Sequence, residues 1–542
     1  MFSKKIVVRG LAFLTSIVLL IVFMSFSAMA TIYYVSSSIG NDAWEGTTPE
    51  PIPAENPTNG PWKSIYRVNG QTFEPGDTIK FKRGDTWITC YWGDGVLTPP
   101  TSGTADNRIT FTNYGTGDLP LFRGAVQIVS SNYRWTKSNS GKNEYYCEAA
   151  GGGFPWLYSV RVVEADNEGL LWKDEPGSLA DHEWGWGDND ALGFNTVYVR
   201  DKSGAPGSEN GFQSVLASQS SCIVINDKSY IDIDGIETRN GSFGIRIIND
   251  AQQNRIMNCV CTHNHDGIDA WADQEDYGGN NEVYNCNCSY NYRHGIMSSN
   301  QGKGFSLIHY NLCEYNNQFG IWIAQANGSC IIEHNECRYN SQDIKDMRWG
   351  YWGIEVVQNS SSDYHIVRYN KCHHNTRPDL KFRDGGGINI RADNAKVYYN
   401  LCYLNDGPGI GGGHMEETPH HDAKVYHNVC YHNCQNYYFY SIWNCAEFFL
   451  HGDIYNYTFS NNIVEKDPEV DYYIVYIQND NGMNLDYNCY YSPDGEYMFS
   501  LDGWSYSFDK WQSYPRYNDS NSFCSDPQFV DAENGDFHIR YG

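Results

Sequence analysis

The sequence is poor in basic residues. Lys and Arg total 38 against 65 Asp and Glu, which gives a formal net charge of −27 at pH 7. A chain with this charge repels the phosphate backbone, so we expect no nucleic-acid partner. The same carboxylates are compatible with divalent cations, which prefer hard oxygen ligands.

Beyond its first thirty residues, the sequence also lacks an apolar run long enough to span a bilayer. Residues 1–30 have the order of a signal peptide: a positively charged start, an apolar run over 11–26, and Ala28-Met29-Ala30 as a small-residue cleavage site. A membrane anchor is the alternative, but the apolar run is short and no charged stop-transfer residues follow it. We therefore expect a mature chain from Thr31 that is secreted, periplasmic or at the cell surface, without membrane contact.

The middle of the chain lacks any helical period and has a different repeat. The repeated motif is an apolar pair, followed by Asn or Cys, any residue, Cys, two further residues and Asn. The copies end at Asn264, Asn291, Asn316, Asn340, Asn375, Asn405 and Asn433. Most copies are followed by Gly-Ile, and successive glycines of these pairs are 22 to 34 residues apart. Such a period with variable insertions is typical of a solenoid, and short strands separated by an Asn turn predict a parallel β-helix.

The cysteines do not follow the pattern of a disulfide framework. The chain has 17 of them, which in an exported protein would normally indicate disulfides. Seven occupy one position of the repeat, namely Cys261, Cys288, Cys313, Cys337, Cys372, Cys402 and Cys430. Stacked coils lie ~4.8 Å apart, so we expect an inward column of small buried side chains whose Cβ atoms lie alongside one another, unsuited to disulfides. The Asn column is expected to hydrogen-bond along the stack.

The repeat also predicts how the chain is divided. After the signal peptide, residues 31–125 are expected to form an N-terminal cap and the first coils. Residues 126–220 fit the period poorly and are predicted to form a small irregular β insertion. Regular coils are expected over 221–435, and C-terminal coils with a cap over 436–542, because the open strands at solenoid ends must be covered.

The chain has Gly-Asp-Thr elements near its start, Asn-x-Cys-x-x-Asn coils and an Asp-Pro-x-Phe-Val-Asp tail. In these features the whole mature chain resembles bacterial right-handed β-helix proteins. This superfamily of pectate lyases, alginate lyases, polygalacturonase-like hydrolases and uronan epimerases implies an all-β right-handed parallel β-helix. Residues 264–269, Asn-His-Asp-Gly-Ile-Asp, resemble the Asn-x-Asp-Gly-x-Asp element of polygalacturonases. They are also similar to the Asp-Asp-Gly-x-Asp calcium element of one pectate lyase family, with His265 in place of the first Asp. The hydrolase pattern implies an Asp-Asp pair where this chain has Arg293-His294, and an Arg-x-Lys element that has no counterpart here.

The strand after each Gly-Ile predicts where function lies. The Ile should face inward, so the next residue faces outward, in a column of Asp269, Met297, Trp322, Glu355 and Asn389. A second outward column contains Trp271 and Arg391, and the residues before each Gly add Asp266, His294 and Trp352. Indole rings beside polar groups suit an exposed groove for a polysaccharide, with Trp271, Trp322, Trp352 and Asn389 as substrate-binding residues. A solvated sheet face is the alternative.

Three functions can use this strip. For β-elimination on an acidic polysaccharide, Asp266, Asp269 and Asp273 or Asp276 would hold Ca²⁺, with Lys303, His294 or Arg391 as base. For hydrolysis, Asp269 and Glu355 lie three coils or ~14 Å apart, too far for a pair, so Glu355 would act with Asp384 or Glu416. The third function is glycan binding without catalysis.

The sequence favours the lyase over the hydrolase. The predicted catalytic residues are Asp269, His294, Lys303, Glu355 and Arg391, and the predicted cofactor is Ca²⁺. We expect a monomer.

Overall fold

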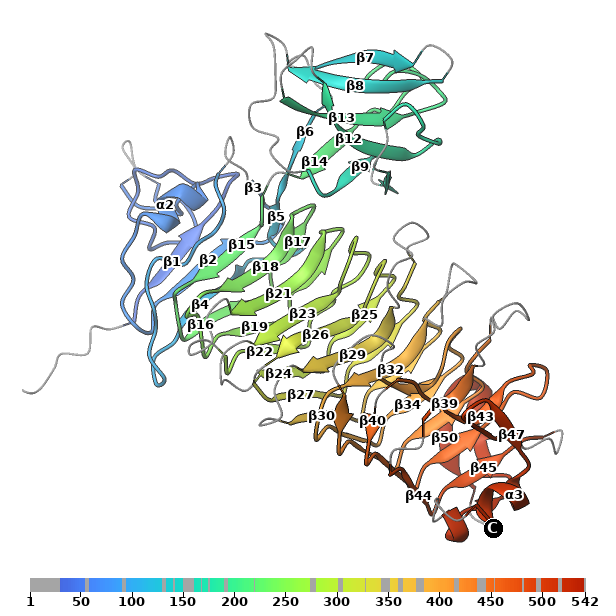
Figure 1. The fold of residues 1–542 in the computed structure, drawn as a ribbon. Coiled ribbons are helices and arrows are strands. Elements are labelled where there is room, and N and C mark those ends of the chain that lie inside the picture. Colours follow the sequence, from blue (N-terminus) through green and yellow to red (C-terminus); the bar gives the residue numbers. More distant parts are fainter. Residues whose placement is uncertain are drawn as a thin grey trace, which may run out of the picture.

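The computed structural model describes most of the mature chain. It covers residues 30–540 except 54–57, 90–93, 129–132, 140–141, 150–159, 167, 174–175, 190–193, 219, 273–278, 301–305, 327, 343–350, 359–363, 377–384, 414–418, 436–444, 453, 480–481, 494–498 and 515–518. The predicted signal peptide lies outside this range apart from Ala30. Coil follows coil from the N-terminal end to the C-terminal end (Figure 1), and three parallel sheets run the length of the stack.

Sheet A is the first of these sheets. It consists of β1 (Ile32–Val35), β2 (Thr78–Lys82), β4 (Ile109–Tyr114), β16 (Ile231–Asp234), β19 (Arg255–Met257), β22 (Glu282–Tyr284), β24 (Ser306–His309), β27 (Cys330–Glu333), β30 (His365–Arg368), β33 (Lys396–Tyr398), β37 (Lys424–Tyr426), β41 (Thr458–Ser460) and β44 (Asn484–Asp486).

Sheet B follows the first Asn turn of each coil. Its strands are β3 (Thr86–Ile88), β5 (Leu121–Arg123), β17 (Glu237–Arg239), β20 (Val260–Thr262), β25 (Leu312–Glu314), β28 (Glu336–Arg338), β31 (Lys371–His373), β34 (Leu401–Tyr403), β38 (Val429–Tyr431), β42 (Ile463–Glu465), β45 (Cys489–Tyr491) and β48 (Phe523–Cys524). Single bridges through Asn287 join β20 to β25.

Sheet C contains the strands that begin around each Gly-Ile. They are β15 (Ile223–Asn226), β18 (Phe243–Ile248), β21 (Asp266–Ala272), β23 (Ile296–Asn300), β26 (Ile321–Ala326), β29 (Trp352–Gln358), β32 (Gly386–Arg391), β35 (Ile410–Gly412), β39 (Ala446–Leu450), β43 (Tyr473–Ile477), β46 (Phe499–Leu501) and the antiparallel β47 (Trp504–Tyr506).

The core is a column of inward side chains from all three sheets. Val283, Ile308, Ile332 and Val367 from sheet A pack with the Gly-Ile isoleucines of sheet C in one cluster. Strand alternation explains this, because every second side chain of a strand points to the same face. The predicted fold class is confirmed by this stack of parallel strands.

Two Asn ladders close the turns between sheets. Asn340 donates its backbone N–H and its Nδ2–H to Asn375 Oδ1, at 3.1 Å each, and a second Nδ2–H to Cys313 O. This first ladder follows the predicted Asn column, which therefore does hydrogen-bond along the stack. A second ladder starts at Asn311, and its last Asn, Asn488, donates its backbone N–H to Ser522 Oγ.

The Cys column points inward, as predicted. Cys313, Cys337, Cys372, Cys402 and Cys430 pair in register on sheet B, and all are fully buried free thiols. A disulfide joins Cys434 to Cys445, outside the column. Beside it, buried Glu447 accepts hydrogen bonds from Asn433 N and Asn433 Nδ2, so a carboxylate ends the first ladder.

A small antiparallel domain interrupts the coils between β5 and β15. One sheet contains β6 (Ala125–Gln127), β9 (Val163–Ala165), β10 (Glu168–Gly169) and β14 (Val215–Ser218). The other contains β7 (Tyr133–Asn139), β8 (Glu144–Ala149), β11 (Leu171–Trp172), β12 (Glu183–Asn189) and β13 (Phe194–Arg200). The domain has its own core and stands above the coil end formed by β17 and β18 (Figure 1).

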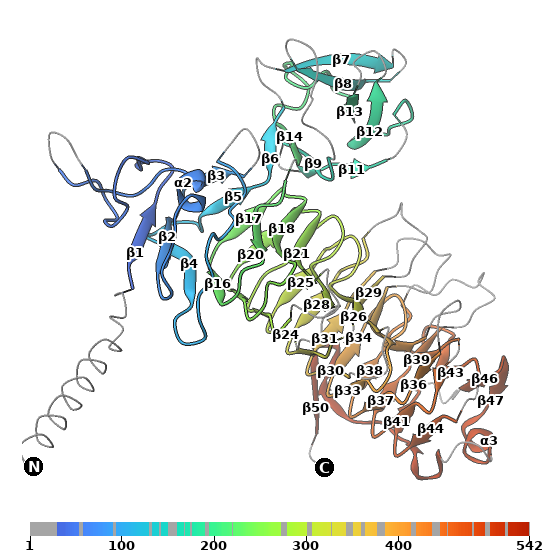
Figure 2. The same cartoon turned by 60° about the vertical axis from the view of Figure 1, so that its left-hand side comes forward.

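Short elements lie outside the three long sheets. They are α2 (Ile65–Asn69), α3 (Phe508–Gln512), η1 (Asp519–Asn521), η2 (Ala532–Asn534), β36 (His420–His421) with β40 (Ile454–Tyr455), and the hairpin β49 (Phe529–Asp531) and β50 (Asp536–Ile539). The hairpin folds back over sheet B, where Phe529 and Phe537 pack on Tyr431 (Figure 2). Among the described residues, no helix has the length and apolarity to cross a membrane.

Candidate active site

The outward face of sheet C brings the predicted residues together in columns. The register aligns Arg246, Asp269, Met297, Trp322, Glu355, Asn389 and Gly411 from coil to coil. Arg391 pairs with Val357 in the second column, and Asp266 pairs with Phe243 in the column before each Gly. Asp269 and Glu355 are therefore three coils apart, as the sequence predicts.

This face is not the exposed strip that the sequence predicts. Asp266, Asp269 and His294 are at most 1 % exposed, and Glu355, Asn389, Arg391 and Trp352 are each under 9 % exposed. The prediction was wrong because it considered single strands, whereas side chains on this face cover one another. Trp352, for example, lies across the next two coils, where a Cβ on Gly386 or Gly411 would come within 2.1 and 2.6 Å of the indole.

Asp266 is held by basic partners. His265 Nδ1–H donates to Asp266 Oδ2 at 2.8 Å, and Arg293 Nη1 lies 3.6 Å from the same oxygen. The backbone N–H of His294 donates to Asp266 Oδ1. Burial works to raise the pKa of Asp266, but the charge and hydrogen bond of His265 and the charge of Arg293 outweigh it and hold the pKa well below its usual range. Asp266 is therefore ionised.

Asp269 has the opposite environment. Its Oδ2 pairs with Arg246 Nε at 2.9 Å, while its buried Oδ1 accepts no hydrogen bond from the part of the chain that the structure describes. Burial, followed by the negative charge of Asp266, raises the pKa of Asp269 to about 7, although Arg246 opposes the shift. Below about pH 7, Asp269 therefore holds a proton that Asp266 does not.

His294 is a neutral imidazole in this cluster. Burial, helped by the charge of Arg293 and opposed by the charge of Asp266, lowers the pKa of His294 to about 3. Its Nε2 lies 3.0 Å from Arg293 Nη2, so this nitrogen accepts the hydrogen bond. The His294 ring contacts Phe319 and Trp322, with centroids 5.4 and 4.9 Å apart. It thus links the carboxyl cluster to the aromatic residues of the next coils.

Those aromatic residues form one cluster over β26 and β29. Phe319, Tyr351 and Trp352 are buried together, with Trp322 packed against them. Phe319 and Trp322 are stacked, with ring centroids 5.7 Å apart. The glycines under Trp352 allow its ring to lie flat along the face. Trp322 is the partly buried ring of the cluster, and an indole can offer apolar surface of the size of a sugar ring.

Glu355 and Asn389 are the last polar residues of the column before Gly411. Its Oε2 accepts from Asn389 Nδ2 at 2.9 Å, and its Oε1 pairs with Arg391 Nη1 at 3.2 Å. Burial raises the pKa of Glu355, and Arg391 and Asn389 work against the shift. Glu355, Asn389 and Arg391 are thus one buried network that orients groups next to the aromatic cluster.

Other predicted residues cannot be placed. Lys303, Asp273, Asp276, Asp384 and Glu416 lie outside the described residues, and Trp271 is described by its backbone alone. Within the described ranges, no group of three or more His, Cys, Asp or Glu could hold a metal ion. The calcium site with Asp266, Asp269 and Asp273 stays a prediction.

Sequence reasoning missed the basic residues of this site. Arg246 precedes Asp269 in the same column, and Phe243 precedes Asp266. The Gly244-Ile245 pair was the available signal, because it extends the repeat one coil toward the N-terminus and places Arg246 outward. Arg293 and His265 gave no repeat signal.

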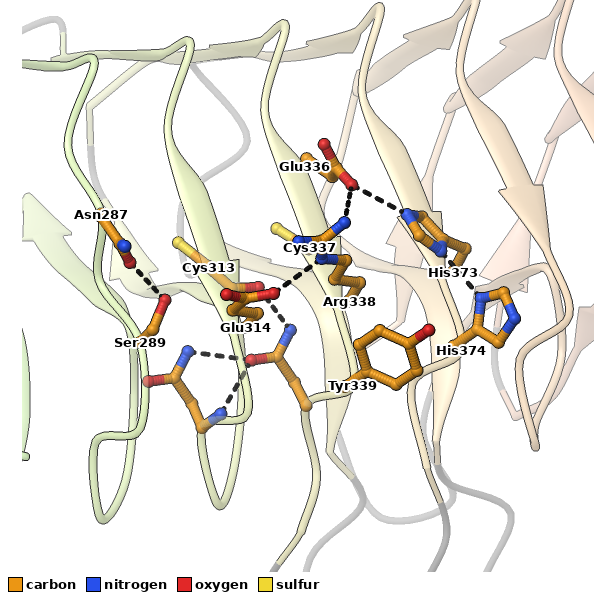
Figure 3. A network of polar contacts seen from close by, with 12 residues as sticks. Asn287, Ser289, Cys313, Glu314, Glu336, Cys337, Arg338, Tyr339, His373 and His374 are labelled. Carbon is orange, nitrogen blue, oxygen red and sulfur yellow. Dashed lines mark hydrogen bonds and ion pairs between the residues drawn. The ribbon is translucent and has the colours of Figure 1, made fainter. Parts of the chain in front are cut away.

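Sheet B carries a second polar network on its outward face (Figure 3). Arg338 Nε donates to Glu314 Oε2 at 2.7 Å, and Arg338 Nη1 donates to Glu336 Oε1. Glu336 Oε1 also lies 3.2 Å from His373 Nε2. His373 in turn contacts His374 through their Nδ1 atoms. Each charge in this network has an opposite partner from its own or a neighbouring coil. The network therefore joins coils and leaves no group poised for chemistry.

Comparison with known proteins identifies the fold. Residues 195–362 match a family model described as a right handed beta helix region. The chain has the fold of a parallel β-helix, and about a third of it matches this family model.

One curated relative of the β-helix protein is lacto-N-biosidase of Bifidobacterium longum subsp. longum, which is 34 % identical over 94 residues. The match spans 17 % of this chain and only 5 % of the relative's length.

Solved structures resemble the chain at low identity. The complex of XylC with xylose has a TM-score of 0.49 at 13 % identity, over 87 % of this chain and 76 % of the other. A lacto-N-biosidase from Eubacterium ramulus has a TM-score of 0.43 at 14 % identity, over 92 % and 67 %. A pectate lyase has a TM-score of 0.41 at 15 % identity, over 80 % and 79 %.

Proposed function

We propose that this chain is a glycoside hydrolase that acts on a polysaccharide or oligosaccharide outside the cytoplasm. Asp266 and Asp269 are its acid–base pair. The observation that carries the proposal is the contrast between these two carboxyl groups of one strand. Asp266 is bound by His265 and Arg293, whereas Asp269 keeps one buried oxygen without a partner among the described residues.

The contrast supports a division of roles between the two groups. Glycoside hydrolysis uses a carboxylic acid that protonates the leaving oxygen and a carboxylate that acts as base or nucleophile. Two carboxyl groups whose environments push their pKa values apart can divide these tasks. Asp269, with its pKa raised to about 7, is the acid, and Asp266, with a lowered pKa, is the base.

The reaction then balances as a hydrolysis. Asp269 gives its proton to the glycosidic oxygen while the bond from that oxygen to the anomeric carbon breaks. Water adds to the anomeric carbon, and Asp266 takes the proton that the water loses. Arg246 and Arg293 keep both carboxyl groups in place through their ion pairs.

Sugar rings next to the cleaved bond would lie along β23, β26 and β29. Trp322, the partly buried member of the Phe319–Trp322–Trp352 cluster, supplies aromatic surface. Glu355 on β29, with Asn389 and Arg391 one coil further on β32, supplies polar groups. The relative of B. longum is named a lacto-N-biosidase, which supports a hydrolase over the β-elimination that the sequence favours.

The test measures two products with one protein. The intact chain is incubated with a panel of neutral and acidic glycans, with and without a chelator, and reducing ends and unsaturated-product absorbance are followed together. The proposal predicts reducing ends without absorbance. Absorbance that disappears with the chelator would instead support the calcium-dependent lyase, and binding without either product would support a glycan-binding protein.

A further inference from the structure

Two arginines pair with Asp266 and Asp269, and a third lies over the ring of the neighbouring Phe243. Arg246 and Arg293 come from the coils, and Arg161 comes from the small antiparallel domain, just before β9. The Cζ atoms of Arg161 and Arg246 lie 5.5 and 4.4 Å from the centroid of one ring, that of Phe243. Phe243 pairs in register with Asp266 on the next coil. The two guanidinium groups therefore share an aromatic support at the edge of the candidate active site.

Arg161 differs from the other two in its partners. Arg246 pairs with Asp269 and Arg293 with Asp266, whereas no carboxylate pairs with Arg161 in the part of the chain that the structure describes. Its side chain is exposed. The charge of Arg161 also reaches the site, because it acts together with burial and Arg293 to lower the pKa of His265. Positive charge is thus in excess at this edge of a chain whose net charge is −27.

The small domain is fixed where it presents Arg161. The backbone N–H of Arg161 donates to Ser218 Oγ at 2.9 Å. Buried Glu164 accepts from Arg239 Nη2 at 3.2 Å and Asn240 Nδ2 at 2.8 Å on the coils. Tyr292 O–H donates to Val163 O at 2.9 Å. The bonds of Glu164 and Val163 bridge the domain and the coils, and the bond to Ser218 holds Arg161 within the domain, so the position of Arg161 relative to Asp266 is built into the fold.

We propose that Arg161, with Arg246 and Arg293, forms a subsite for an anionic group of the glycan, so that the small domain selects charged over neutral chains. A guanidinium fork binds planar or tetrahedral oxyanions with two hydrogen bonds, and among the described residues no carboxylate occupies the fork of Arg161. A carboxylate of a uronic acid and a sulfate ester share this chemistry. The location beside the cleaved bond rests on the proposed function, but the anion preference does not require cleavage.

The experiment uses pairs of probes that differ in charge alone. Uronic-acid oligosaccharides are compared with their methyl esters, and sulfated oligosaccharides with their desulfated forms, which also separates the two sources of the anion. Binding is measured by calorimetry in the Asp269→Asn protein, which prevents turnover. We expect one charged member to bind at least tenfold more tightly than its neutral partner.

Variants at Arg161 then assign the preference. Arg161→Met should remove about tenfold of the affinity for the charged member and leave the neutral member unchanged, and Arg161→Lys should restore part of the loss. Lys424→Met removes one exposed positive charge from β37 on sheet A and serves as the matched control, which should change neither. In the otherwise wild-type enzyme, Arg161→Met should raise KM for the charged substrate and leave kcat within twofold.

The outcomes separate this inference from the proposed function. Equal binding of charged and neutral members in every pair overturns the inference, as does a charge preference that survives Arg161→Met. A charge preference that depends on Arg161, without any cleavage by the wild-type protein, supports the subsite and removes the hydrolase. Cleavage by the wild-type protein without a charge preference supports the hydrolase and removes the subsite.

Discussion

Sheet B and the outward face of sheet C belong to the same coils but differ in kind. The inward position of sheet B repeats Cys from Cys313 to Cys430, and the turns beside this sheet carry stacked rings such as Tyr290, Tyr315 and Tyr339, 4.9 to 5.0 Å apart. On sheet C, the column changes at every step, from Arg246 through Asp269, Met297 and Trp322 to Glu355.

The difference shows what repetition does in a solenoid. Stacked rings cover one another's faces, so the ring ladders beside sheet B stabilise the stack and leave edges, not faces, for a ligand. On sheet C, unlike neighbours create the unequal environments of Asp266 and Asp269. Repetition therefore marks stability and variation marks chemistry. The following predictions test this contrast.

The largest effect is expected at the acid. Asp269→Asn removes the transferable proton and should lower kcat/KM at least ~100-fold, while circular dichroism and the melting temperature stay close to wild type. Asp232→Asn is the matched control, because Asp232 is a buried, Arg-paired carboxylate on sheet A. It should keep activity within about twofold. Equal loss of activity in both variants would contradict the assignment of Asp269.

A ladder residue should affect stability and leave chemistry intact. Asn375→Ala deprives Asn340 N and Nδ2 of their acceptor and Cys337 O of its donor. Buried groups left without partners should lower the free energy of unfolding by about 2 to 4 kcal/mol. Denaturant unfolding measures the loss, and kcat of the folded fraction should be unchanged. A selective loss of kcat would show that the ladder takes part in the chemistry.

The pH profile should report Asp269. Because its pKa is raised to about 7, the proton needed for catalysis is present below that pH, and kcat/KM should fall about tenfold per unit above it. The same group binds its proton more tightly when folded than at its ordinary pKa of 3.8, so its contribution to stability falls as pH rises from 3.8 to about 7. A rate that is constant up to pH 9 excludes Asp269 as the acid.

The aromatic cluster should contribute to binding. Trp322→Ala removes a ring face next to Phe319 and should raise KM about tenfold, equivalent to ~1.4 kcal/mol. Trp322→Phe keeps a ring there and should recover most of the affinity, as measured by steady-state kinetics. If the Phe variant behaves like the Ala variant, the indole N–H and not the ring face is the important contact.

The smallest effect is expected at the ring ladders. Tyr315→Ala should lower the free energy of unfolding by about 1 kcal/mol, since the ring loses two stacking partners. Tyr315 has φ of 53°, a left-handed conformation that Asn adopts readily, so Tyr315→Asn should lose less than the Ala variant. Glycan affinity should not change in either. Weakened binding in both variants would mean that sheet B also contacts the ligand.

The sequence by itself determined the parts of this protein that repeat. Asn340 and Cys337 recur at one position of each coil, and stacking at a fixed spacing makes like residues neighbours, so their column, direction and bonding could be predicted. The same register placed Asp269 and Glu355 in one column.

Only the tertiary structure decided what surrounds those residues. Burial of the sheet C face depends on side chains from neighbouring coils, such as Trp352 lying over Gly386 and Gly411, and it reverses the exposure predicted from single strands. The proton affinities of Asp266 and Asp269 depend on Arg293, His265 and Arg246, which belong to no repeated pattern. Arg161 reaches Phe243 from a separate domain more than eighty residues earlier in the chain. Packing between residues far apart in the sequence brings such groups together, and the local repeat of the sequence does not predict these contacts.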